Sequence, residues 1–122
     1  MKENVVKDKS KAFAIRVVRL YRHLCEDKKE YVLSKQVLRC GTSIGANIHE
    51  AIYGQSDKDF ASKMSIALKE ASETEYWLEL LAETDYITPE EYKSIATDCS
   101  EINRLLISIV KSAKENLLKN KE

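Results

Sequence analysis

One apolar stripe near the middle of the chain constrains the fold more than any other feature. Five apolar residues recur there at helical spacing and define one face of a helix: Val37, Cys40, Ile44, Ile48 and Ala51. Gly41 and Gly45 lie one turn apart on the flank of this face. Because a glycine inside a helix costs about 1 kcal/mol relative to alanine, we expect a neighbouring helix to approach the backbone closely there. The stripe therefore predicts a helix that packs against other helices.

Three other segments show the same helical periodicity, and only short polar stretches separate them. The expected helices cover about residues 9–25, 34–53, 57–83 and 89–118. Helices joined by short connections pack antiparallel to their sequence neighbours, so the pattern predicts an all-α, antiparallel up-down-up-down four-helix bundle. A chain of 122 residues supports one core, and we expect residues 1–122 to form a single domain.

Local signals indicate where two of these helices begin or end. Ser34 is interpreted as the N-cap of the second helix, and Gly54 as the residue that follows its last turn. Thr88, Pro89 and Glu91 form the pattern of a capping box with proline at the first helical position. This pattern predicts the start of the fourth helix.

Charge is unevenly distributed along a chain whose formal net charge is zero. Residues 1–40 hold eleven Lys/Arg against five Asp/Glu, residues 41–101 four against thirteen, and residues 102–122 five against two. The basic and acidic segments could pair within one chain or between chains, or leave a basic surface for an anionic partner. Pairing between neighbouring helices is the favoured interpretation.

The cysteines and the hydropathy pattern bear on the cellular compartment. Cys25, Cys40 and Cys99 are odd in number, far apart and on expected apolar faces. They are interpreted as small buried residues of a protein in the reducing cytoplasm. Because no apolar run reaches about 18 residues, we expect no membrane partner.

Several polar residues fall at or near the expected core. They come from the second, third and fourth helices and are interpreted as a buried polar network: Arg39, Asn47, Thr74, Glu75 and Asn103. Buried polar groups need hydrogen-bond partners, and Arg39 is the candidate partner of Glu75. Such a network fixes the register between helices or lines a functional pocket.

A second apolar strip lies on the flank of the third helix and includes Ile66, Trp77 and Leu80. A monomeric bundle has no further helix to cover it. An uncovered strip of this kind is typical of a protein interface, so we expect a homo-oligomer that uses these residues.

The sequence TSIGANIHEAIYGQS, followed by DFASKMSIALKEASETEYWLELL, resembles the 23S rRNA intervening-sequence protein family. The resemblance runs from about Phe13 to past Leu81. It implies a four-helix bundle that assembles into homo-pentameric rings, similar to the accessory protein of diversity-generating retroelements, which binds nucleic acid and a reverse transcriptase. Gly45, His49 and Ala51 depart from the family pattern, in which Pro, Ala and Gly often occupy these places.

The expected function is a non-enzymatic scaffold or adaptor that assembles with itself and binds RNA or an RNA-associated protein. Lys and Arg contacts to phosphate dominate nucleic-acid affinity. The candidate contacts come from the first helix and the tail of the fourth: Arg16, Arg19, Arg22, Lys111 and Lys114. The basic pattern lacks an aromatic-studded groove for single strands.

An enzymatic alternative rests on Arg16 and His23, which loosely fit the Arg-His spacing of HEPN-type ribonucleases. There the histidine would act as general acid or base and the arginine would stabilise charge on phosphate. Neither histidine follows a glutamate by three residues, and the cysteines are scattered, so we expect no metal and no cofactor.

Overall fold

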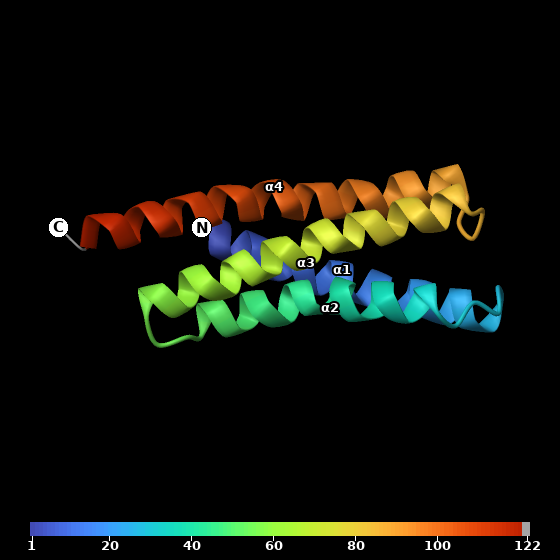
Figure 1. The fold of residues 1–122 in the computed structure, drawn as a ribbon, viewed down its shortest axis with the longest axis horizontal. Helices are drawn as coiled ribbons and strands as arrows, with labels where there is room; N and C mark the ends of the chain where they lie inside the picture. The colour runs from blue at the N-terminus through green and yellow to red at the C-terminus, as the bar shows by residue number, and fades with distance from the viewer. Residues whose placement is uncertain (121–122) are drawn as a thin grey trace.

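The computed structural model describes residues 1–120 as four long α-helices (Figure 1). They are α1 (Lys2–Glu26), α2 (Leu33–Ile52), α3 (Asp57–Glu83) and α4 (Pro89–Asn120). The described residues contain no strand. The predicted all-α four-helix bundle is therefore confirmed, whereas assembly into a ring stays a prediction.

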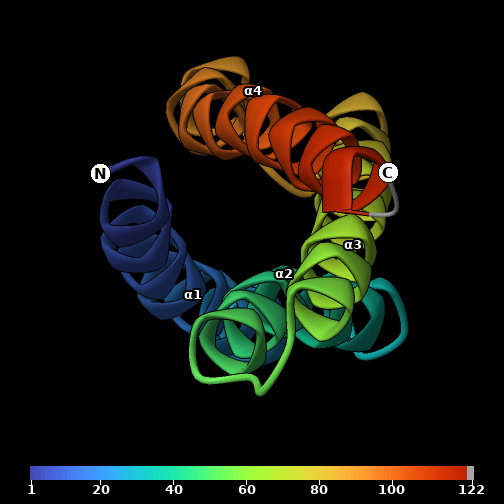
Figure 2. The same ribbon diagram turned by 90° about the vertical axis from the view of Figure 1, so that its left-hand side faces the viewer.

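The helices follow one another around the bundle in chain order. Each helix contacts its sequence neighbours, and α1 and α4 close the circle (Figure 2). Within the described residues, no Cα atom of α1 lies within 8 Å of one in α3, and the same holds for the diagonal pair α2 and α4. The outer faces of α1 and α3 therefore point to opposite sides of the molecule.

The core contains apolar side chains from all four helices. Its largest fully buried members are Phe13, Leu24, Ile44, Ile48, Met64, Leu78, Leu81, Ile102 and Leu106. Each helix supplies them at three- and four-residue spacing, which is the pattern that identified the helices in the sequence. None of the described helices is sufficiently long and apolar to traverse a lipid bilayer.

α1 and α2 approach each other closely where α2 carries its two glycines. A Cβ atom on Gly41 would lie 2.8 Å from both γ-carbons of Val17 in α1. A Cβ atom on Gly45 would lie 3.4 Å from the backbone oxygen of Ser10. The missing side chains thus let α1 and α2 pack with their backbones close together.

The start of α1 lies seven residues before its predicted position. Val6 is buried in the additional turns. Val5 and Val6 are the only apolar residues between Met1 and Ala12 in the sequence, so little apolar periodicity signals the additional turns. At the other end of the chain, α4 continues to Asn120, two residues beyond the predicted end.

Glu30, and not Ser34, caps the start of α2. The Glu30 carboxylate accepts hydrogen bonds from the backbone N–H groups of Val32 at 3.2 Å, Leu33 at 3.0 Å and Ser34 at 2.7 Å. Ser34 lies inside the helix, where its hydroxyl donates to the Glu30 carbonyl oxygen. The N-cap assignment of Ser34 was therefore wrong.

The capping box at the start of α4 is confirmed. The Thr88 N–H donates to Glu91 Oε1 at 2.8 Å, and the Glu91 N–H donates to Thr88 Oγ1 at 3.1 Å. Reciprocal bonds of this kind satisfy two N–H groups that a helix start leaves free.

Candidate functional site

The seam between α1 and α4 is held by polar contacts that recur every seven residues of α1. Lys2 Nζ lies 2.6 Å from Ser108 Oγ, and Lys9 Nζ lies 2.7 Å from Glu101 Oε1. Arg16 donates to Asp98 Oδ2 at 2.6 Å. Part of the basic charge of α1 thus pairs with acidic side chains of α4 in the same chain.

Arg16 is consequently held in place by α4. Besides Asp98, its guanidinium donates to the Ser94 carbonyl oxygen at 3.2 Å and to Ser94 Oγ at 2.8 Å. A guanidinium with three such acceptors has few donors left for a phosphate group.

The five candidate phosphate contacts do not form one surface of the protomer. Arg19 and Arg22 are exposed in the C-terminal half of α1. Lys111 and Lys114 are exposed near the C-terminal end of α4, which lies beside the N-terminal end of α1, as the Lys2–Ser108 bond shows. The two pairs therefore lie toward opposite ends of the bundle.

Arg16 and His23 line the same hollow between α1 and α4, a cavity of about 530 Å³. The His23 Nδ1 atom lies 2.7 Å from Asp27 Oδ2 in the following turn. Glu90 and Glu91 line the opposite wall. Because Arg16 is held by Asp98 and Ser94 and acidic side chains face His23, this hollow is a poor place for a substrate phosphate.

The predicted polar network is replaced by separate, mostly local bonds. Arg39 is exposed and donates to Glu73 Oε2 at 3.0 Å, not to Glu75. Asn47 donates to the Ser43 carbonyl oxygen at 2.9 Å, and Thr74 to the Glu70 carbonyl oxygen at 2.7 Å, each within its own helix. The pairing of Arg39 with Glu75 was wrong because Glu73 and Glu75, two residues apart, point to different sides of α3.

Among the described residues, two members of the predicted network do contact each other across helices: Glu75 in α3 and Asn103 in α4. The Asn103 Nδ2 group donates to Glu75 Oε1. Burial raises the pKa of the Glu75 carboxyl, and the nearby charge of Glu79 raises it further. Asn103 Oδ1 is buried without a hydrogen-bond partner among the described residues.

Buried cysteines and acidic groups provide no evident nucleophile or metal ligand set. Burial, followed by the charge of Glu75, raises the pKa of the Cys99 thiol to about 12. Cys99 therefore stays protonated and unreactive at neutral pH. Across residues 1–120, no group of three or more His, Cys, Asp and Glu side chains is arranged to hold a metal ion.

The predicted apolar strip on α3 lies partly against the core and partly in solvent. Ile66 is 39% exposed, whereas Trp77 and Leu80 are half-buried. The Trp77 indole N–H donates to Glu73 Oε2 at 3.2 Å. Tyr76, which the sequence pattern did not single out, is 59% exposed and meets the Trp77 ring edge-on with 5.1 Å between centroids.

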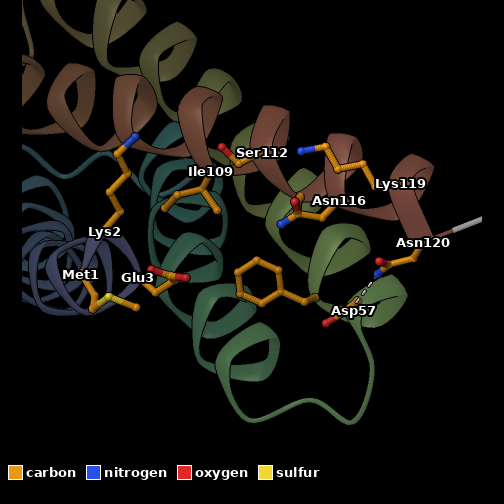
Figure 3. A pocket seen from close by; sticks show the side chains of 11 residues that line it. Met1, Lys2, Glu3, Asp57, Ile109, Ser112, Asn116, Lys119 and Asn120 are labelled. Carbon is orange, nitrogen blue, oxygen red and sulfur yellow. Dashed lines mark hydrogen bonds between the residues drawn. The ribbon is translucent and has the colours of Figure 1, made fainter.

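A cleft of about 670 Å³ opens where the start of α1 faces the start of α3 and the end of α4 (Figure 3). Phe60, Ile109 and Ala113 contribute its apolar part, and Asn120 Nδ2 lies 3.5 Å from Asp57 Oδ2 at its rim. Lysine and acidic side chains both line it, so its charge selects no ligand class.

A known protein of similar sequence shares this fold. Residues 2–108 match the family model described as 23S rRNA-intervening sequence protein. The chain is 65% identical to a protein with unknown function from the S23 ribosomal protein family of Bacteroides thetaiotaomicron VPI-5482, whose crystal structure is known. That alignment covers 91% of this chain and 99% of the other, with a TM-score of 0.89. No curated protein matches the chain.

Proposed function

The chain belongs to the 23S rRNA-intervening sequence protein family, and from this premise we propose that it is a non-enzymatic, self-assembling scaffold or adaptor. In this proposal copies of the bundle associate into a ring of five, as the resemblance implies, in the cytoplasm. The assembled ring presents a surface to RNA or to an RNA-associated protein.

A strip along the outer face of α3 is the observation that carries the proposal. Its residues follow one another at alternating four- and three-residue spacing: Ser62, Ile66, Lys69, Glu73, Tyr76, Leu80 and Glu83. Its apolar members, Ile66, Tyr76 and Leu80, keep this spacing, and apolar residues so spaced are typical of a helix that packs lengthwise against another helix. Ile66 and Tyr76 are exposed in the protomer and would become buried in such a contact.

A second strip with the same kind of spacing follows the outer face of α1. It contains Val5, Asp8, Ala12, Ile15, Arg19 and Arg22. Val5 is 42% exposed and Ile15 is 44% exposed. α1 and α3 lie diagonally across the bundle (Figure 2), so strips on their outer faces would point to opposite sides of the protomer. When two different faces of identical copies contact each other, the copies form a closed ring if the rotation from each copy to the next adds up to one full turn.

Charge favours the pairing of the α1 strip with the α3 strip of the next copy. α1 and α3 run parallel in an up-down-up-down bundle, and rotation about an axis along the bundle keeps them parallel between copies. Arg19 and Arg22 at the C-terminal half of α1 then face Glu73 and Glu83 at the C-terminal half of α3. Complementary charges of this kind fix orientation and exclude wrong pairings.

A charge placed in the α3 strip tests the proposal. In the double variant Ile66→Lys/Tyr76→Lys, two lysines would be forced against Arg19 and Arg22 and against apolar side chains, so assembly is expected to fail. Light scattering should then give the 14.0 kDa mass of one chain. Ile107→Lys, which adds a lysine at an exposed apolar position of α4 outside both strips, is the matched control and should keep the wild-type mass.

The proposal is wrong if wild-type protein has the mass of one chain, or if Ile107→Lys and the double variant change the mass equally. Circular dichroism of each variant establishes that the helices remain folded.

A further inference from the structure

A groove lies between the outer sides of α1 and α2, beside the α1 strip, with which it shares Asp8. It encloses about 510 Å³, a volume common for small-molecule sites. Lys7, Asp8, Ser10, Lys11 and Ala14 line it from α1, and Thr42, Gly45, Ala46 and His49 line it from α2. Gly45 has no side chain to fill this space, and the neighbouring alanines are small.

Cationic side chains predominate around the groove. Lys7 and Lys11 line it, and Asp8 is the single acidic residue among the lining residues. Lys7 Nζ lies 3.1 Å from the phenol oxygen of Tyr53, and this bond raises the pKa of the Lys7 ammonium. Lys7 therefore stays charged at neutral pH, and Tyr53 holds it beside the groove.

An exposed aromatic pair stands beside these cations. Tyr53 is 63% exposed, and its ring centroid lies 4.7 Å from that of His49. Lys7 Nζ lies 5.3 Å from the centroid of the Tyr53 ring. Exposed aromatic rings beside lysines form the combination with which proteins hold the bases and phosphates of single-stranded nucleic acid.

We propose that the α1–α2 groove binds a nucleotide, with its phosphate between Lys7 and Lys11 and its base against Tyr53 and His49. This inference deepens the proposed function and rests on it, because that proposal supplies RNA as the source of the nucleotide. The groove itself is complete within one protomer, because all of its residues come from α1 and α2 and the turn that follows α2.

Phosphate recognition is tested with the double variant Lys7→Ala/Lys11→Ala. Fluorescence anisotropy of a labelled single-stranded oligoadenylate of about ten nucleotides measures affinity at several salt concentrations. We expect at least about tenfold weaker binding than for wild type, and a salt slope smaller by about 0.7, because the contact to one phosphate is lost. Lys58→Ala/Lys93→Ala removes the same charge from exposed positions of α3 and α4, outside the groove and both strips, and should change affinity less than about twofold.

Base stacking is tested at Tyr53. Tyr53→Ala removes the ring and should weaken binding of the same oligoadenylate roughly tenfold. Tyr53→Phe keeps the ring and loses only the hydroxyl group that contacts Lys7, so most of the affinity should remain. Tyr53 is exposed, and circular dichroism is expected to show that both variants fold.

Competition with adenosine monophosphate identifies the source of the nucleotide. Displacement of the labelled strand by the free nucleotide assigns the groove to mononucleotides, and resistance to it assigns the groove to a strand. The inference is overturned if wild-type protein binds neither the strand nor adenosine monophosphate at low salt. It is also overturned if the two lysine double variants lose equal affinity, or if Tyr53→Ala binds like wild type.

Different variants can refute the assembly proposal and the groove proposal independently of each other. Ile66→Lys/Tyr76→Lys is expected to abolish assembly while each monomer keeps its groove, and Lys7→Ala/Lys11→Ala is expected to keep the assembled mass. Loss of binding with mass intact in the lysine variant therefore reports on the groove alone.

Discussion

At the scale of single residues, the decisive features are carboxylates in unusual surroundings and glycines at a helix contact. Glu30 and Glu75 are both removed from bulk solvent, yet their environments shift their pKa values in opposite directions. Glu30 receives backbone N–H donors, whereas Glu75 has one amide donor and a like charge nearby. Hydrogen bonding to the charged form decides the difference.

Substitution of Glu75 by Gln should stabilise the protein at neutral pH. The raised pKa of Glu75 means that the folded state binds a proton more readily than the unfolded state, so the stability contribution falls as pH rises from the unfolded to the folded pKa. Glutamine carries no charge and can donate to Asn103 Oδ1, so we expect a gain of about 1 kcal/mol. Urea denaturation across this pH range should show a smaller pH slope for Glu75→Gln. A loss of stability at neutral pH would contradict this explanation.

Removal of the Glu30 carboxylate should destabilise the start of α2. Burial alone would raise the pKa of Glu30, but the N–H donors of Leu33, Ser34 and Val32 together hold it below its ordinary value. The resulting stability is present above the unfolded pKa and is lost as pH falls through the folded pKa. Glu30→Ala should cost about 1–2 kcal/mol at neutral pH, and wild type and variant should converge in acid. Glu26→Ala, at an exposed position just before the loop, is the control and should change little.

The two glycines of α2 should respond differently to alanine. A methyl group on Gly41 would overlap the γ-carbons of Val17, which are buried and cannot easily move. Gly41→Ala should therefore destabilise by about 1–3 kcal/mol. Gly45→Ala meets only ordinary contact and gains helix propensity, so its free energy of unfolding should rise by up to about 1 kcal/mol. Equal effects in thermal denaturation would refute the close packing at Gly41.

At the scale of elements, the sequence predicted the features that depend only on residues within one helix, namely its position and its local caps. Apolar periodicity located all four helices, and the Thr88–Glu91 box located a helix start because both partners lie within one turn. Glu30 was missed because its carboxylate reaches forward from the loop, which turns through the left-handed backbone of Lys29 (φ 56°). No sequence pattern marks such a cap.

The α1–α4 seam should be the most salt-sensitive contact in the bundle. Its pairs Lys9–Glu101 and Arg16–Asp98 are partly exposed, and screening weakens pairs of this kind. In the monomeric variant Ile66→Lys/Tyr76→Lys, hydrogen exchange in the N-terminal half of α1 should accelerate at high salt, while α2 and α3 change little. Asp98→Asn/Glu101→Gln should remove this salt effect. Uniform acceleration across all helices would mean that the seam does not open by itself.

At the scale of the whole molecule, tertiary packing decided the questions that the sequence left open. The sequence could not tell whether Arg39 meets Glu73 or Glu75, since that depends on the rotation of α2 against α3. Nor could it place Lys7 beside Tyr53, 46 residues away. The bundle leaves two heptad-like strips on opposite sides and a cationic, aromatic groove between them, which together suit an assembling scaffold that carries a phosphate-bearing partner.

Light scattering of the wild-type protein tests the central claim of self-assembly most directly. We expect one discrete species of about 70 kDa, about five times the 14.0 kDa chain, because in the proposed ring the α1 strip of each copy contacts the α3 strip of the next copy. A single species at 14.0 kDa would contradict the account, since the exposed Ile66 and Tyr76 would then have no partner in another copy.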